Sequence, residues 1–187
     1  MRSDEQRGQS SVEFGLAAVV LLLLALGLTD LGRVFYFDVG LAGAAREGAR
    51  QATWFDPKAG TNPYLYDGAI QAAVDGVLTH SGLPASVLQN PSGKTCPTTS
   101  DANSQYNPPY TNDAYAAGGT NQPLLYICYE GTPGFDLTAA PTDNSLRGQD
   151  VNVIIVMSFG FATGFMQGVL GNAVHMAVNT HMIVGGF

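Results

Sequence analysis

The sequence predicts an α+β protein in which a long N-terminal helix, half of it in a membrane, packs on a small antiparallel sheet. Two observations carry this prediction. Residues 14–29 are uncharged and mostly Leu, Ala and Val, and the helical pattern continues beyond them to residue 53. The segments with the apolar pattern of strands all follow residue 123. At 187 residues, the chain is long enough for one anchor and one modest domain with its own core.

The first eight residues form a short polar segment ahead of the apolar run. They include Arg2 and Arg7, and basic residues before a membrane span favour a cytoplasmic N terminus and an exported C terminus. We therefore expect three parts: a leader at 1–8, a helix at 9–53 and an exported α+β domain at 54–187.

Gly8 lies five residues before Glu13, a lone carboxylate at the mouth of the apolar run. A charge at the edge of hydrocarbon loses water that nothing in the helix replaces, so Glu13 needs a partner. The N-terminal amine of Gln9, freed by cleavage after Gly8, would be such a partner. Gly8, Gln9, Glu13 and Phe14 are therefore the candidate residues of a leader-processing site.

The membrane span is expected over about residues 14–32, because a helix needs about 20 apolar residues to cross a bilayer. Only Asp30 and Arg33 interrupt its outer end, and their spacing places them on one helix face, where they can pair. A cleaved secretory signal is not supported, because no convincing small-x-small site follows the apolar core. An uncleaved signal anchor fits the apolar run equally well, and only Gly8 and Glu13 favour a processed helix.

Beyond the membrane, small residues recur at every fourth position of the helix. Gly40, Ala44, Gly48 and Ala52 form a stripe with almost no side chains along one face. Such stripes let another helix or a sheet approach closely. Each glycine costs about 1 kcal/mol of helix propensity relative to alanine, so packing must offset it. The partner is either this protein's own sheet or a neighbouring subunit.

A second helix and a long loop are expected before the strands. Apolar residues recur at helical spacing over 66–80, which predicts an amphipathic helix. Residues 89–123 are dominated by Asn, Pro, Ser, Thr, Gly and Tyr and predict a long surface loop. Tyr106, Tyr110 and Tyr115 in this loop either form an adhesive or partner-binding surface or fold back onto the core.

Strands are predicted at 124–129, 150–159 and 178–184. The two cysteines, Cys96 and Cys128, lie on the expected exported side, where one disulfide is the natural interpretation. Such a bond would attach the loop to the sheet. The alternative is two free buried thiols.

The region between the last two strands is ambiguous. No Lys, Arg, Asp or Glu follows Asp150, and Gly160, Gly164, Gly168 and Gly171 resemble a transmembrane packing stripe. A second span at 151–171 is therefore one interpretation. The other is an exposed, glycine-rich apolar lip at 160–172 that contacts membrane or a partner.

The sequence offers no catalytic motif. The signatures of serine hydrolases, zinc proteases and P-loop proteins are absent, and His80, His175 and His181 are scattered. We therefore expect no enzyme, no metal site and no cofactor. Beyond Arg50, three basic residues stand against nine acidic ones, so nucleic-acid binding is not expected either.

Three stretches of the N-terminal helix resemble the TadE-like family, small pilin-like proteins of bacterial tight-adherence (Tad/Flp) pilus systems. They are residues 7–14, with the glycine and glutamate of type IV prepilins, residues 30–33 and residues 44–50. The resemblance covers about the first 50 residues and returns faintly at 178–184. The middle, roughly 55–147, matches only in being variable.

The resemblance implies a pilin-like fold, cleavage by a prepilin-type peptidase after Gly8, and Glu13 as the fifth-position acid of the mature chain. Gln9 departs from the phenylalanine common at the first mature position, so the resemblance does not extend to N-methylation. The implied partners are that peptidase, other pilin subunits, the inner-membrane pilus assembly platform and membrane lipid.

The sequence thus predicts a minor pilin-like component of a tight-adherence type IV pilus. It would be held in the inner membrane by one span, processed after Gly8 and used in pilus assembly and surface adhesion. The alternative is an uncleaved, membrane-anchored extracytoplasmic binding or adhesion module that does not polymerise.

Overall fold

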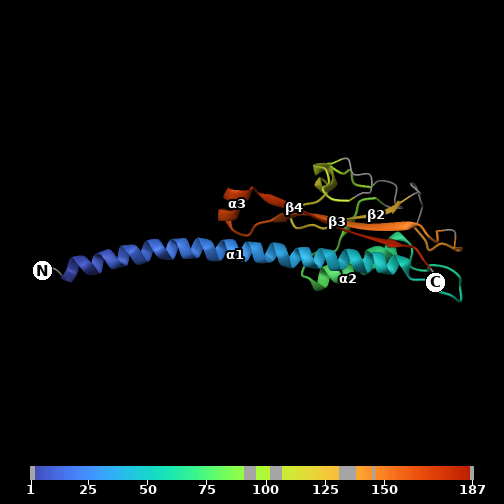
Figure 1. The fold of residues 1–187 in the computed structure, drawn as a ribbon, viewed down its shortest axis with the longest axis horizontal. Helices are drawn as coiled ribbons and strands as arrows, with labels where there is room; N and C mark the ends of the chain where they lie inside the picture. The colour runs from blue at the N-terminus through green and yellow to red at the C-terminus, as the bar shows by residue number, and fades with distance from the viewer. Residues whose placement is uncertain (1–2, 91–95, 102–106, 131–137, 145, 186–187) are drawn as a thin grey trace.

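One long helix and a compact domain give the molecule an elongated shape. The computed structural model describes residues 3–90, 96–101, 107–130, 138–144 and 146–185. Helix α1 (Ser3–Thr53) is 51 residues long. Its N-terminal half projects as a stalk, and its C-terminal half carries the domain (Figure 1). The long N-terminal helix predicted from the apolar run is confirmed.

Helix α2 (Asp67–His80) packs against the second half of α1. Ile70, Val74 and Leu78 recur one turn apart in its sequence and are fully buried. The backbone N–H of Ser81 then closes the last turn by donating to the carbonyls of Val77 and Leu78. The second helix expected at 66–80 is therefore confirmed.

Four strands form one sheet in the order β1-β2-β3-β4. They are β1 (Val87–Leu88), β2 (Leu124–Glu130), β3 (Asp150–Gly160) and β4 (Ala173–Ile183). The pairs β2–β3 and β3–β4 are antiparallel, as predicted, and the short β1 joins β2 in parallel. The α+β class is confirmed, with a sheet that is mixed because of β1.

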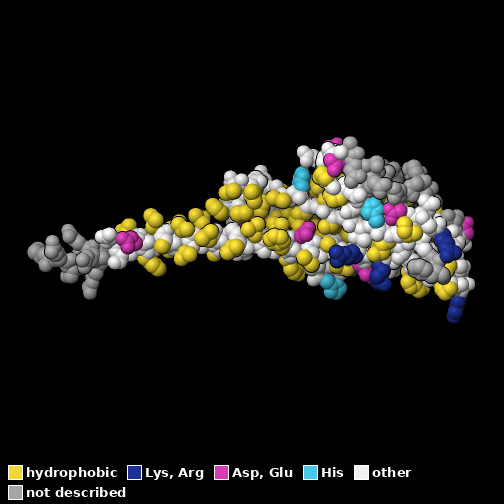
Figure 2. All heavy atoms as spheres, viewed as in Figure 1, with side chains coloured by type: hydrophobic (Ala, Val, Ile, Leu, Met, Phe, Trp, Pro, Cys, Tyr) yellow, Lys and Arg dark blue, Asp and Glu magenta, His cyan; other side chains and the backbone are white. Residues whose placement is uncertain are grey.

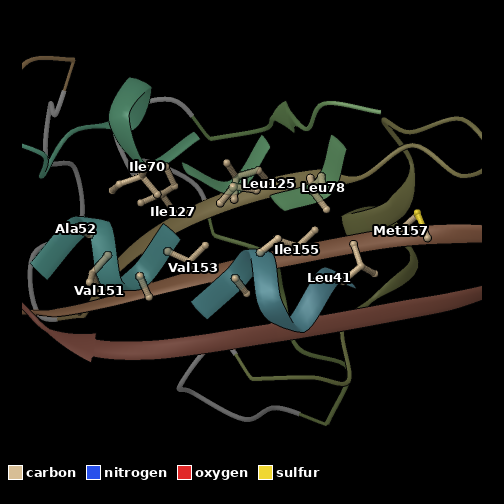
Figure 3. Close-up of a cluster of buried hydrophobic side chains, with 14 of the residues drawn as sticks. Leu41, Ala52, Ile70, Leu78, Leu125, Ile127, Val151, Val153, Ile155 and Met157 are labelled. Carbon is tan, nitrogen blue, oxygen red and sulfur yellow. The ribbon is translucent and has the colours of Figure 1, made fainter. Parts of the chain in front are cut away.

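The main core lies between the two helices and one face of the sheet (Figure 3). Alternate residues of β3 point into it, as the two-residue period of a strand requires. Its fully buried members in α1, α2, β2 and β3 are Leu41, Ala44, Ala45, Ala49, Ala52, Ile70, Val74, Leu78, Leu125, Ile127, Val151, Val153, Ile155, Met157 and Phe159. Leu65 and Val184, which lie outside these elements, are fully buried in it as well.

Strand β3 is buried on its other face as well. Ile154 and Val156 point away from the helices and pack in a second cluster with Tyr110 and Tyr115. Tyr115 ends a short 3₁₀ helix, Asn112–Tyr115, within the predicted loop. The loop thus covers the outer face of the sheet. Of the two interpretations of the loop tyrosines, folding back onto the core is confirmed for Tyr110 and Tyr115, because both side chains are buried. Tyr106 lies outside the described residues.

The second membrane span considered at 151–171 is wrong. Residues 151–160 form the central strand β3, because their β-branched side chains are covered on both faces. The short helix α3 (Gly164–Leu170) follows, and β4 begins at Ala173, five residues earlier than predicted. Gly171 ends α3 with φ of 89°, a backbone conformation that favours glycine.

Candidate functional site

The stalk, the N-terminal half of α1, presents hydrophobic side chains along its length (Figure 2). In the described part of the chain, α1 is the one helix long and apolar enough to cross a membrane, and none of its most apolar stretch is buried. The large side chains exposed along this stretch are Val12, Phe14, Leu16, Val19, Val20, Leu21, Leu22, Leu24, Leu26, Leu28 and Leu31. An exposed apolar surface of this extent indicates a membrane or partner helices around it.

The predicted processing residues lie at the start of this apolar surface. The backbone is helical through Gly8, and the Gln9 side-chain amide donates a hydrogen bond of 3.1 Å to Glu13 Oε1. Gln9 and Glu13 therefore share one face, as residues four apart do. Both Glu13 and Phe14 are exposed. The carboxylate of Glu13 thus contacts the side chain of Gln9, the residue whose peptide nitrogen cleavage after Gly8 would turn into an amine.

The small-residue stripe faces the rest of the same chain. A Cβ added at Gly48 would lie 2.6 Å from Val74 Cγ2 of α2 and 3.3 Å from Val153 Cγ1 of β3. A Cβ added at Gly40 would lie 3.0 Å from the Ser81 side chain. Ala44 and Ala52 are fully buried. The stripe therefore lets α1 approach α2 and the sheet closely.

A buried carboxylate joins the stalk to the domain. Asp30 is completely buried although it lies at the C-terminal end of the apolar run. It accepts hydrogen bonds from the backbone N–H of Ala162 at 3.0 Å and of Thr163 at 3.1 Å, and from the Thr163 hydroxyl at 2.5 Å. We call Asp30, Ala162 and Thr163 the Asp30 clasp.

The clasp also organises the helix that follows it. The Thr163 hydroxyl oxygen accepts from the backbone N–H of Met166 at 3.4 Å, which caps α3 while the same hydroxyl donates to Asp30. A Thr before a short helix is a local signal for a cap. Its pairing with Asp30 spans 133 residues, and sequence reasoning missed it because no local pattern encodes it.

Arg33 approaches the clasp from one side. Its Nη1 lies 3.4 Å from Asp30 Oδ1, so the pairing that the sequence spacing allowed is present. Its guanidinium carbon lies 5.2 Å from the ring centre of Phe159 and 6.0 Å from that of Phe37. Both rings are within the range of a favourable cation–π arrangement.

Helix α3 forms an apolar lip beside the stalk. Phe165, Val169 and Leu170 are exposed, whereas Met166 points inward. A Cβ added at Gly27 of α1 would lie 3.7 Å from the sulfur of Met166 and 3.9 Å from Phe165. A shallow apolar groove of about 370 Å³ runs along this contact, lined by Val20, Leu23, Leu24, Gly27, Leu28, Leu31 and Phe165.

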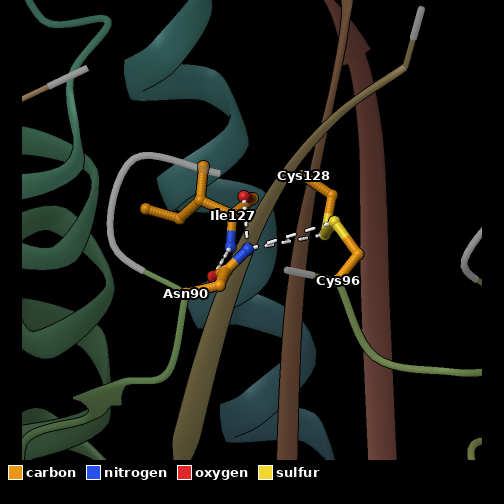
Figure 4. The surroundings of a disulfide bond; sticks show 4 residues. All are labelled: Asn90, Cys96, Ile127 and Cys128. Atoms are coloured by element: carbon orange, nitrogen blue, oxygen red, sulfur yellow. Dashed lines mark hydrogen bonds between the residues drawn. A yellow bond between two sulfur atoms is a disulfide. The ribbon is translucent and has the colours of Figure 1, made fainter. Parts of the chain in front are cut away.

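A disulfide joins Cys96 to Cys128 of β2, at a sequence separation of 32 residues (Figure 4). Buried Asn90 supports it: its side chain accepts from Ile127 N and donates to Ile127 O, both at 2.8 Å. Asn90 therefore continues the pairing of β2 where β1 has ended. The bond attaches the segment before the 3₁₀ helix to the sheet, as predicted for a disulfide.

Several titratable side chains beyond the apolar stretch are held by contacts with other side chains of the fold. The hydrogen bonds from Arg50 hold the pKa of Glu47 below its ordinary value. His181 contacts Asp150 at 2.6 Å and Asn107 at 2.9 Å, and His175 stacks on Tyr115. Among the described residues, no group of three or more His, Cys, Asp and Glu could hold a metal ion.

Comparison with known proteins supports the N-terminal assignment. The family model described as TadE-like protein matches residues 8–50, so the resemblance inferred from the sequence is confirmed over this segment. The matched residues run from Gly8 through the exposed apolar stretch and into the part of α1 that packs on the domain. Searches of curated proteins and of solved structures gave no significant match.

Proposed function

We propose that the protein is a minor pilin-like subunit of a tight-adherence pilus. In this proposal α1 anchors it in the inner membrane, a prepilin-type peptidase cuts after Gly8, and the processed subunit joins the pilus through α1. The match to the TadE-like family indicates a component associated with Tad pili. The observation that carries the proposal further is that the matched segment coincides with a helix whose apolar surface is left exposed.

The mechanism of assembly rests on Glu13. An exposed carboxylate at the mouth of a membrane span is unfavourable unless it meets a positive charge or hydrogen-bond donors. Before cleavage, the Gln9 amide is its hydrogen-bond partner. After cleavage, the amine of Gln9, in the same subunit or in a neighbouring one, would pair with it. Helices of neighbouring subunits that pair in this way would replace their contacts with lipid by contacts with each other. Other pilin subunits and the assembly platform would be the partners in this step.

The variant Glu13→Ala tests this mechanism. We expect the variant to remain in the membrane fraction, because the apolar stretch is unchanged, and to be missing from sheared pili. Asp38→Ala is the matched control, since Asp38 is an exposed carboxylate on the same helix beyond the span. Normal incorporation of Glu13→Ala into pili would contradict the mechanism.

The uncleaved binding module is the second candidate function, favoured by a core that the domain completes with α1 of the same chain. Gly8→Ala separates the two. If the protein is a processed pilin, this variant keeps its leader and loses incorporation into pili. Full biological activity of Gly8→Ala would establish the binding module instead.

A further inference from the structure

We propose that α3 lies in the outer leaflet of the membrane beside α1, so that lipid acyl chains cover Phe165, Val169 and Leu170. The protein would then contact the bilayer through two elements, the span and this lip. The inference rests on the proposed membrane anchor and deepens it, because it sets the depth at which the domain sits.

The position of α3 along α1 is the first argument. A bilayer's hydrocarbon core is about 30 Å thick, which a helix crosses in about 20 residues. Counted from Phe14, the first residue after Glu13, the span reaches Arg33. Gly27, which faces α3, then lies roughly 10 Å inside the outer boundary of the hydrocarbon. Tilting α1 would draw Gly27 deeper.

The chemistry of the lip is the second argument. Helix α3 has no charged side chain, and none of Lys, Arg, Asp or Glu occurs anywhere in residues 151–187. Val169 is 64 % exposed and Leu170 is 51 % exposed. In Figure 2 hydrophobic side chains are present both along the stalk and on the end of the domain next to it. The lip therefore extends the same apolar surface that marks α1 as a span.

The hydrogen bonding of the turn is the third argument. Backbone away from water must satisfy its polar groups internally. The N–H groups of Ala162 and Thr163 donate to Asp30, and the Gln167 side chain donates to the carbonyl of Phe161 at 3.1 Å. The N–H of Gly171 donates to the carbonyl of Gln167 at 3.0 Å. This turn therefore suits a site without water.

The same arrangement explains how Asp30 is tolerated. By the count from Phe14, Asp30 lies about 6 Å inside the hydrocarbon boundary, where an exposed carboxylate is strongly unfavourable. The Asp30 clasp removes it from lipid completely, since Asp30 is 0 % exposed. The domain thus supplies polar partners at a depth where lipid offers none.

A tryptophan probe tests the depth of α3. Trp54 is the only tryptophan of the chain and lies about 30 Å beyond Arg33 along α1, so in the native protein it reports from outside the membrane. Trp54→Phe combined with Val169→Trp moves the probe to the lip, and Trp54→Phe combined with Leu22→Trp moves it to mid-span. Both new positions are exposed and accommodate the larger ring without repacking.

The full chain is reconstituted in phosphatidylethanolamine and phosphatidylglycerol vesicles with brominated acyl chains, at a low ratio of protein to lipid. Bromine quenches only a tryptophan that it contacts. We expect strong quenching and blue-shifted emission for the Leu22→Trp and Val169→Trp probes, and no quenching of native Trp54. Leu170→Trp in the same background should repeat the result at a second position of the lip.

Each other outcome has a distinct meaning. Quenching of the Leu22→Trp probe without quenching of the two lip probes would overturn the placement of α3 and leave the anchor intact. Absence of quenching at all positions would overturn the anchor and with it the proposed function. Lip probes that are blue-shifted but unquenched would show that a second copy, rather than lipid, covers the lip, and this also overturns the proposal.

Discussion

At the scale of single residues, Asp30 connects two parts of the chain that sequence keeps far apart. Replacing it with alanine removes the acceptor of the three hydrogen bonds of the clasp and of the longer one from Arg33, each strengthened by the negative charge. We expect Asp30→Ala to lower the free energy of unfolding by on the order of 3 kcal/mol. The measurement is denaturant unfolding of the full chain in detergent.

Asp38→Ala serves as the control for this prediction, because Asp38 is exposed on the same helix and should change the stability little. Thr163→Val should lose part of what Asp30→Ala loses, since it removes the hydroxyl and keeps the backbone donor. Equal stabilities of Asp30→Ala and Asp38→Ala would show that the clasp does not hold the domain to α1.

Among the glycines of α1, Gly48 has the least room for an added Cβ. An alanine there gains helix propensity of about 1 kcal/mol but forces its methyl against Val74, whose branched side chain is stiff. We expect Gly48→Ala to destabilise the protein by about 1–2 kcal/mol net, as overpacking of a filled core does. Thermal unfolding measures the difference.

Gly76 is the matched control. It is an exposed helical glycine of α2 with no atom within 4 Å of an added Cβ. Gly76→Ala should raise the stability by about 0.5–1 kcal/mol. A stabilising Gly48→Ala would mean that α1 and α2 can separate at little cost, contrary to the packing described.

The two residue-level features differ in how far the sequence predicts them. The small-residue stripe is visible because its period of four is local, and its burial follows from the cost of glycine in a helix. The sequence did not determine which element packs against the stripe, because small residues indicate a close approach but do not identify the element that approaches. The Asp30 clasp could not be predicted, since a single carboxylate and a single threonine carry no information about each other.

At the scale of elements, strand β2 and the segment around Cys96 depend on their covalent link. A bond that closes a loop of this separation, 32 residues, restricts the unfolded chain and contributes about 3–4 kcal/mol. We expect Cys96→Ser combined with Cys128→Ser to lower the stability by about that amount. Denaturant midpoints of the variant and the native protein measure it.

The reduced native protein is the control for this variant, because it loses the bond without any change of sequence. The two should unfold at similar denaturant concentrations. If the variant and the reduced protein both have the same denaturant midpoint as the oxidised native protein, the attachment of the loop to β2 rests on Asn90 and the buried tyrosines rather than on the disulfide.

The buried tyrosines of the sheet and of the loop that covers it should lower the stability of the fold at alkaline pH. Burial raises the pKa of Tyr110, Tyr115, Tyr126 and Tyr129 above the ordinary value for a phenol. The folded chain therefore keeps protons that the unfolded chain releases above a pH of about 10. Stability from these groups is fully present below that pH and falls as the pH rises further.

Unfolding followed across this pH range checks the prediction. Tyr129→Phe removes one of the four groups, so its stability should fall less steeply with pH than that of the native protein. Parallel pH profiles for the two proteins would show that ionisation of Tyr129 is not linked to unfolding.

Among the elements, α2, β2 and β3 were predicted because each has a strong local period or a long β-branched run. Helix α3 was not predicted as a helix, because seven residues with two glycines carry little helical signal. Strand β1 escaped prediction as well, since two residues form a strand only when β2 lies beside them.

At the scale of the whole molecule, the stalk and the domain share one helix. The sequence predicted this division, because the apolar run ends near residue 30 while the helical pattern continues to residue 53. How the domain meets the stalk depends on contacts between α1 and α3, which are distant in sequence. The packing of the lip against α1 therefore could not be predicted from the sequence.

The identity of the first residue in the protein recovered from its own cells tests the central claim most directly. Intact mass and terminal sequencing provide it, with Gly8→Ala as the uncleavable control. A chain that begins at Gln9 is the predicted result and establishes the processing on which assembly as a pilin depends. A chain that retains Met1 or Arg2 would contradict the account and leave a signal-anchored exported domain.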